Sequence, residues 1–525
     1  MSTTRRGFLG AAALAGAATV LDRLSPVALA QARQGRRVFL HGVASGDPLH
    51  HSVILWTRAT PPPERREVPV SYEIARDANF ARIVGRGMQM TGAARDFTVK
   101  VDAAGLEPGA TYYYRFSALG EASPVGRTRT LPRATPRVRL AVASCSNLPW
   151  GYFNAYRRIA ERQDLDAVLH LGDYIYEYRN AQYGDGTQFG RVPMPDKEIT
   201  TLEDYRTRHA QYKSDPDLQE AHRAHPWIVV WDDHEFANNA WRHGALNHQP
   251  AMGEGPWEAR RDAAIQSYME WMPIREAGMS REPRIYRAFA FGTLADLVML
   301  DTRYIGRDQE APKREHIDII EDPKRSVLGA TQEQWLFDEL RASKQAGVTW
   351  QLLGQQVMFA PMAPGGSPSA NKDTWDGYRP ARDRVIDFLE AERMPNGVIL
   401  TGDVHSSWAY DVARDPWRAY DPRTGRGAAA VEIVTPAISS PGWGTNQPDK
   451  APAMAREYLA ARPHLKWVEG VHRGYVTIDV TPARMQADWY FVPTVTEKTG
   501  AEAFARGFVS EAGAPRLVEA TTPAG

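Results

Sequence analysis

The sequence predicts an α/β fold in which a mixed β-sheet core flanked by helices follows a small β-sandwich. After about residue 137, continuous apolar runs alternate with helical patterns, as expected for buried strands with helices on both faces of a sheet. Before that point, short alternating segments are separated by Gly, Pro and Asp, which is typical of an all-β unit. The 525 residues are enough for two or three domains, and 43% hydrophobic and 24% charged residues are globular values.

The β-rich part covers residues 36–132. In the segment LEPGATYYYRFSA, Tyr112 and Tyr114 fall on one face of a predicted strand and Tyr113 on the other. The pattern Leu-x-Pro-x-x-x-Tyr-x-Tyr-Arg-Phe resembles the penultimate strand of fibronectin type III sandwiches. We therefore expect a fibronectin III-like β-sandwich, with these aromatic side chains in its core.

The α/β part covers residues 137–495. Helices are expected at about 154–162 and from Thr331, whose side chain could cap a helix start. The segment RGYVTIDVTPARMQADWYFV predicts two antiparallel strands, and residues 496–525 form a tail that could fold over the site as a lid. Six apolar runs predict the other strands: VRLAVASC, DAVLHLGD, HPWIVVWDDHE, ADLVMLDTR, TWQLLGQQVM and GVILTGDVHSSW.

Residues 1–32 have the layout of a signal peptide, with a basic start, a short apolar run and an Ala-Leu-Ala end. The pair Arg5-Arg6 before that run matches the twin-arginine signal. A membrane anchor is the alternative, but the apolar run is short and is broken by Gly. We expect recognition by the twin-arginine export machinery, a periplasmic or secreted location and no stable membrane anchor.

Charge and cysteine content narrow the function further. Lys plus Arg and Asp plus Glu both number 63, so net charge gives no reason to require a nucleic-acid partner. Cys145 is the single cysteine, and an exported chain with one cysteine cannot form an internal disulfide. A lone cysteine is usually a buried apolar residue, but the neighbours of Cys145 favour a ligand.

Polar side chains stand at the ends of several predicted strands, where ligands of α/β sheets gather. An Asp at one strand end is often only a helix cap, but several strand ends together indicate a shared site. Carboxylates and imidazoles bind divalent and trivalent ions, and thiolate with phenolate favours Fe(III). The residues are Cys145, Asp173, Tyr176, Asp232, Asp233, His234, Asp301, Asp403 and His405.

The motifs LGDYIYEY, WDDHEFANNAW and TGDVHSSW, with a preceding SCSN in place of Asp-x-His, resemble the alkaline phosphatase D (PhoD) family. That family is a variant of the calcineurin-like metallophosphoesterases. The segment HGVASGDPLHHSVILWTR resembles the start of its N-terminal domain, and the resemblance runs from about residue 38 to 490. It implies a metallophosphoesterase-type core that uses Fe(3+) and Ca(2+).

The resemblance also implies roles for single residues. Asp173 would bridge two metals, and Tyr176 would be a phenolate ligand to iron. Cys145 stands at the first-motif strand end, and Asp403 and His405 take the place of the Gly-His-x-His ligands.

The central motif, WDDHEFANNAW, offers two neighbouring aspartates for one ligand position. Asp233 replaces a ligand Asn, with Asp232 as the open alternative. His234 matches the His that contacts substrate and protonates the leaving oxygen. Asn238, Asn239 and Arg303 are weaker candidates for contacts with the phosphate.

The sequence therefore predicts an exported, metal-dependent phosphoester hydrolase that uses a metal-activated hydroxide. Its substrates would be phosphomonoesters, with phosphodiesters as an extension. One alternative is a phosphodiesterase or phospholipase D-like enzyme with the same site and a lipid substrate. Another is a non-catalytic calcium-binding sandwich protein, which would need neither His234 nor Cys145.

Overall fold

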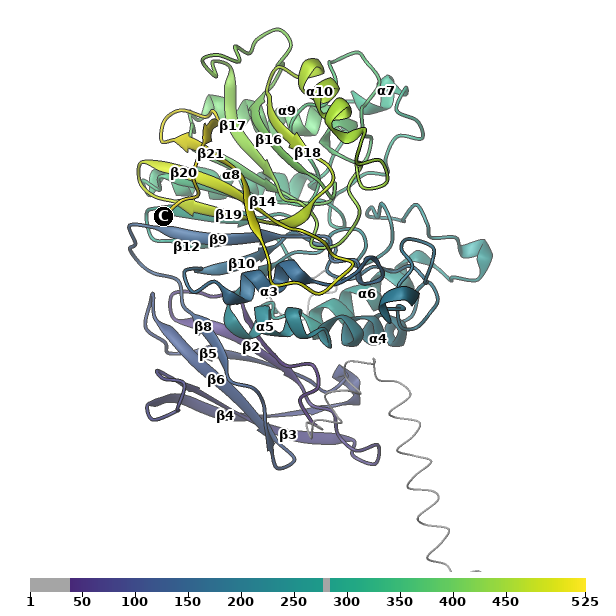
Figure 1. The fold of residues 1–525 in the computed structure, drawn as a ribbon, viewed down its shortest axis with the longest axis vertical. Coiled ribbons are helices and arrows are strands. Elements are labelled where there is room, and N and C mark those ends of the chain that lie inside the picture. The colour runs from purple at the N-terminus through teal and green to yellow at the C-terminus, as the bar shows by residue number, and fades with distance from the viewer. Residues whose placement is uncertain (1–37, 277–283) are drawn as a thin grey trace, which may run out of the picture.

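The computed structural model describes residues 38–276 and 284–525, which build three β-sheets with helices packed around them (Figure 1). The predicted signal peptide lies outside the described residues. In the described part of the chain, every helix is too short or too polar to cross a bilayer. The observed α/β arrangement with a β-rich N-terminal part confirms the predicted fold class.

The largest sheet has ten strands in the order β22-β21-β20-β19-β9-β10-β11-β1-β2-β5. Strands β9, β10, β11 and β1 lie next to one another in this order and are parallel. The remaining pairs of neighbouring strands in this sheet are antiparallel. The strands are β1 (Val43–Gly46), β2 (Ser52–Arg58), β5 (Thr98–Ala104), β9 (Val138–Ala143), β10 (Ala167–His170), β11 (Pro226–Val229), β19 (Arg473–Val480), β20 (Arg484–Val492), β21 (Ala503–Glu511) and β22 (Val518–Ala520).

A second sheet of seven strands has the order β12-β13-β14-β15-β17-β16-β18, with β13, β14, β15 and β17 parallel. All six predicted apolar runs are strands, but three lie in each sheet, a division that the sequence did not show. The strands are β12 (Arg287–Phe291), β13 (Ala295–Met299), β14 (Trp350–Gly354), β15 (Gly397–Thr401), β16 (Ser407–Ala413), β17 (Ala428–Val434) and β18 (Leu465–Glu469).

The two sheets share one apolar core, which joins Leu140 and Val142 of β9 to Leu297, Leu352 and Val398 of the second sheet. Helices cover the outer faces (Figure 1). Those beside the ten-stranded sheet are α3 (Asn154–Glu161), α4 (Leu202–Lys213), α5 (Pro216–Ala224) and α6 (Trp257–Trp271). Those beside the seven-stranded sheet are α7 (Ile317–Ile320), α8 (Gly329–Gln345), α9 (Arg379–Ala391) and α10 (Ala451–Ala461).

One helix start differs from the prediction. Helix α8 begins at Gly329, and the Ser326 hydroxyl accepts the Gly329 N–H at 2.7 Å, so Thr331 is not the cap. Gly329 has φ +72°, a backbone conformation that is strained for a residue with a side chain. The turn at Gly329 therefore places the helix start two residues before the expected Thr331. His170, at the end of strand β10, lies in the core, and its Nε2 is 2.8 Å from the Tyr156 hydroxyl.

The N-terminal part is a sandwich whose second sheet has five strands. That sheet packs on β1, β2 and β5 through a core that contains Tyr112, Tyr114 and Phe116, as the alternation predicted. One half of the sandwich continues into the large sheet, because Ser45 of β1 pairs with Pro226 of β11. The strands are β3 (Glu67–Ala75), β4 (Ile83–Gly92), β6 (Thr111–Ala118), β7 (Glu121–Ala122) and β8 (Gly126–Arg129).

The C-terminal tail is not a lid. Residues 503–511 and 518–520 are strands β21 and β22 at the edge of the ten-stranded sheet. The carbonyl of Gly525 accepts a hydrogen bond of 2.8 Å from Arg139, near the start of β9 and at the opposite end from Cys145. The lid prediction fails because the alternation in this segment lets it pair with β20.

Candidate metal centre and active site

A cavity of about 560 Å³ lies where strands of both main sheets end. Its wall contains most of the residues that the sequence singled out. Cys145 and Tyr176 lie buried beside it, and Arg303 is not on its wall. The predicted residues that line it are Asp173, Asp233, His234, Asn238, Asn239, Asp403 and His405.

Tight turns at the strand ends aim these side chains inward. Cys145, Asp173, Asp403 and His405 all have φ between +54° and +64°, in the left-handed region that non-glycine residues rarely adopt. Such backbone conformations cluster at functional sites because the surrounding structure must hold them. A Cβ on Gly172 would lie 2.5 Å from the Asp232 nitrogen, so only glycine lets the two loops touch.

The first ligand group brings together a thiol, a carboxylate and an imidazole, and a phenol lies beside them. Ligand atoms of Cys145, Asp173 and His405 lie within 4.8 Å of one another. The Tyr176 hydroxyl donates to Asp173 Oδ2 at 2.8 Å, lies 3.2 Å from His405 Nε2, and accepts from Ser440 at 2.7 Å. Burial, with the Asp173 charge next, raises the pKa of both the Cys145 thiol and the Tyr176 phenol well above their usual ranges. Both groups must lose a proton to bind a cation.

Two further ligand groups share members with the first. One joins Asp173, Asp233 and His234, and the other joins Asp232, Asp233 and Asp403. Within these ligand groups, three carboxylate oxygens are buried without a hydrogen-bond partner among the described residues: Asp173 Oδ1, Asp232 Oδ2 and Asp233 Oδ1. Buried charges are normally paired or bound to metals, so the donor set fits cations. Asp233 belongs to two groups and Asp232 to one, which favours Asp233 as the ligand.

Arg303 is the counter-charge of these carboxylates rather than a cavity residue. Its guanidinium is fully buried and donates through Nε to Asp232, through Nη1 to Asp373 at 2.8 Å and through Nη2 to Asp403 at 2.8 Å. Asp233 lies 3.5 Å from Nη2. These carboxylates occupy every nitrogen, so the structure does not favour the predicted contact with phosphate.

Burial and Arg303 set the charges of these carboxyl groups. Burial raises the pKa of Asp403 to about 8, against the opposing effect of Arg303. Burial also raises the pKa of Asp232 well above its usual range. For Asp233, burial would raise the pKa, but Arg303 and His234 together lower it to about 2.

His234 is poised to donate a proton. Its Nδ1 donates to Glu177 Oε2 at 2.7 Å, and its ring centre lies 4.3 Å from that of Tyr176. Burial lowers the pKa of His234, but the charges of Asp233 and Glu177 outweigh it and raise this pKa well above its usual value. This direction favours the protonated imidazole, with Nε2 left for a ligand in the cavity.

Two glutamates organise the site and were missed in the sequence. Glu235 accepts backbone N–H groups of Asp232 at 2.7 Å, Asp173 at 3.0 Å and Tyr174 at 2.5 Å, which ties two loops together. Glu177 holds His234 and also accepts the Asn238 N–H at 2.7 Å. Both stand inside the quoted motifs, DDHE and YIYEY, which was the available signal.

Asn238 and Asn239 differ in the hydrogen bonds that hold their side chains. Asn239 donates its backbone N–H to Asp233 at 2.6 Å and its side chain to Glu310 at 3.3 Å. Asn238 has its backbone held by Glu177, and its side chain lines the cavity. Of the two, Asn238 is better placed to contact a bound phosphate.

Comparisons with known proteins point to one family. The model of the PhoD-like phosphatase family matches residues 140–489, and the model of its N-terminal domain matches residues 25–132. Alkaline phosphatase D of Bacillus subtilis (strain 168) is 41% identical over 489 residues, which are 90% of this chain and 80% of the relative. A solved structure of PhoD matches with a TM-score of 0.83 and 39% identity over 93% of both chains.

Proposed function

The chain belongs to the PhoD-like phosphatase family of phosphoric ester hydrolases, and from this membership we propose that it is an exported, metal-dependent alkaline phosphatase. The observation that carries the metal dependence is the set of three overlapping ligand groups around Asp173 and Asp233. Elemental analysis of the purified protein, with activity measured after chelation, tests it. Full activity of a metal-free protein would refute the metal dependence.

The ligand chemistry suits two kinds of ion. Cys145, Tyr176 and His405 with Asp173 would hold Fe(3+), because thiolate and phenolate favour an oxidised transition metal. The carboxylates of Asp173, Asp233 and Asp403 would hold Ca(2+), which prefers oxygen ligands. When bound, such ions supply Lewis acidity that polarises phosphoryl oxygens and makes water a better nucleophile.

The chain's own side chains perform the proton transfer and the positioning. His234 would donate its Nε2 proton to the leaving oxygen, and Glu177 holds the ring in place through Nδ1. Asn238 would donate to a phosphate oxygen from the cavity wall. Glu235 keeps the loops of Asp173 and Asp232 in register.

The substrate is proposed to be a phosphomonoester, with phosphodiesters accepted by the same site. A phosphodiesterase or phospholipase D-like activity on a lipid remains the second candidate, because the cavity wall also carries Met358, Met362 and Trp408. Comparing turnover of a mono- and a diester of nitrophenol separates the two. We also propose export by the twin-arginine machinery to the periplasm or beyond, without a membrane anchor or a nucleic-acid partner.

A non-catalytic calcium-binding protein fits less well. Such a protein would need neither His234 nor Cys145, yet each belongs to a ligand group on the cavity. Bound calcium without hydrolysis of any phosphoester would favour this alternative.

Replacing the thiol tests the iron site. Cys145→Ser is expected to lose iron and the visible absorption band, because a serine hydroxyl is a much poorer anionic ligand than a thiolate. Iron content and the absorption spectrum measure this. Ser144→Ala is the matched control, since it removes only the 3.1 Å hydrogen-bond partner of the thiol. Unchanged colour in Cys145→Ser would remove Cys145 from the site.

Replacing the imidazole tests proton donation. His234→Ala is expected to lower kcat by about 100- to 10,000-fold on a primary alkyl phosphate, because general acid catalysis has that value. The loss on 4-nitrophenyl phosphate should be smaller, about tenfold, because nitrophenolate leaves without a proton. Steady-state kinetics on both substrates measure the difference. Equal losses would assign His234 to metal or substrate binding instead.

A further inference from the structure

One cation on the cavity wall, Arg462, has no anionic partner within residues 38–276 and 284–525. Arg462 follows helix α10, lines the cavity and is only 9% exposed. Among the described residues, no carboxylate forms an ion pair with it. Its Nε is buried without a partner, and Nη1 makes only a 3.4 Å contact with the Tyr458 carbonyl. A buried charge in this condition is costly unless a ligand completes its contacts.

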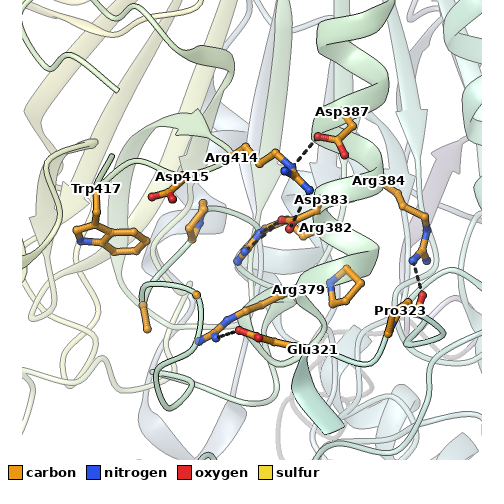
Figure 2. Close-up of a pocket in the computed structure, with 14 residues that line it drawn as sticks. Glu321, Pro323, Arg379, Arg382, Asp383, Arg384, Asp387, Arg414, Asp415 and Trp417 are labelled. Carbon is orange, nitrogen blue, oxygen red and sulfur yellow. Dashed lines mark hydrogen bonds and ion pairs between the residues drawn. The ribbon is translucent and has the colours of Figure 1, made fainter. Parts of the chain in front are cut away.

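Other buried arginines show how such charges are usually satisfied. Arg208 has no carboxylate either, but it donates to five backbone carbonyls, those of Tyr176, Tyr178, Met194, Pro195 and Lys197. A second cavity, of about 520 Å³, is lined by several arginines, which hold carboxylates of its own wall (Figure 2). The pairs of the buried arginines are Arg379 with Glu321 and Arg382 with Asp383, and the exposed Arg414 pairs with Asp387. Among the described residues, Arg462 has no carboxylate partner, and the long contact with the Tyr458 carbonyl is its one side-chain hydrogen bond.

Aromatic rings lie around Arg462 on the same cavity wall. The guanidinium carbon of Arg462 is 5.2 Å from the ring centre of Tyr458. The Tyr458 ring centre lies 5.0 Å from that of Trp408 and 5.3 Å from that of Trp443. All four side chains line the cavity that contains His234 and Asp173. A flat apolar group can pack here while an attached anion reaches the guanidinium.

We propose that Arg462, with Trp408, Trp443 and Tyr458, forms a leaving-group subsite for phosphoesters whose leaving group combines a flat apolar part with a second anionic group. The anion, a carboxylate or a phosphate, pairs with the Arg462 guanidinium. The scissile phosphate lies at Asp173, Asp233 and His234. This substrate class rests on the proposed hydrolase function and deepens it. Arg462 acts on specificity and does not touch the reacting atoms.

Substrate pairs that differ only in charge test the subsite. The first pair is 4-carboxyphenyl phosphate and 4-carbamoylphenyl phosphate, and the second carries the same groups on a two-carbon spacer. In Arg462→Gln, the ratio of kcat/KM for acid over amide is expected to fall by about 10- to 100-fold in at least one pair, as for loss of a charge-assisted hydrogen bond. The control is Arg418→Gln, which replaces a mostly exposed arginine outside the cavity. This variant should keep the wild-type ratio of kcat/KM for acid over amide.

The outcomes separate the subsite from the activity. The subsite proposal is overturned if Arg462→Gln keeps the wild-type ratio of kcat/KM for acid over amide in both pairs. It is also overturned if the variant and wild type both turn over the amides faster than the acids. If wild type hydrolyses no phosphoester at all, the proposed function fails instead. If wild type is inactive, or if the Arg462→Gln variant does not fold, calorimetry on metal-loaded wild-type protein tests the subsite instead. In this measurement 4-hydroxybenzoate should bind at least tenfold more tightly than 4-hydroxybenzamide. Equal affinities of the two compounds would overturn the proposal.

Discussion

Asp173→Asn is expected to lose more than one metal ion and to lower kcat by at least about 1,000-fold, equivalent to about 4 kcal/mol of lost transition-state stabilisation. Asp173 is common to two of the three ligand groups, and its Oδ1 is buried without a protein partner. An amide of the same size keeps the packing but removes the negative charge that both ions would share. Elemental analysis and kinetics on 4-nitrophenyl phosphate measure the two losses.

Asp301→Asn is the matched control for that change. Asp301 also follows a strand, but its Oδ1 accepts the backbone N–H groups of Arg303 at 3.0 Å and Tyr304 at 2.9 Å, as in a helix cap. It belongs to no ligand group among the described residues. Asp301→Asn should therefore keep the metal content. Normal metal content in Asp173→Asn would show that Asp173 is not a bridge.

Arg303→Met is expected to lower the free energy of unfolding of the metal-free protein by about 3–5 kcal/mol, because it leaves buried carboxylates without their counter-charge. The guanidinium contacts Asp232, Asp373 and Asp403 and has Asp233 nearby. Urea unfolding of the metal-free protein measures the change. Arg418→Met, which removes a mostly exposed arginine, should give no measurable shift.

The loss in Arg303→Met should depend on pH and on added cations. Burial already raises the pKa of Asp403 to about 8, and removing the guanidinium would raise it further. A carboxyl whose pKa is raised in the folded state costs stability as pH rises from its unfolded pKa, about 4, through its folded pKa. The part of the deficit that Asp403 causes should therefore appear above about pH 8, where this carboxyl is ionised in wild type, and vanish at lower pH, where it is protonated in both proteins. Excess Ca(2+) should restore part of the stability, and a deficit independent of both would contradict the counter-charge role.

Local patterns in the sequence were enough to locate the elements that carry the site. Each apolar run forms a strand because its side chains are buried on both faces, whichever sheet it joins. Asp173, Asp233 and Asp403 follow such runs directly, so their position at strand ends needs only local information. The structure brings them together with Cys145, Tyr176 and His405, while their roles as ligands remain predictions.

The sequence by itself determined the fold class, the two-part order of the chain and most of the acidic, imidazole and thiol side chains that gather at or beside the cavity. Only the tertiary structure decided that the strands divide between two sheets and that the tail pairs with β20. It also decided that Arg303 neutralises carboxylates, whereas Arg462 on the cavity wall has no carboxylate partner in the described part of the chain. The physical reason is that strand pairing and the pairing of buried charges join segments far apart in the chain. Hydrophobic periodicity and motif spacing report only on near neighbours.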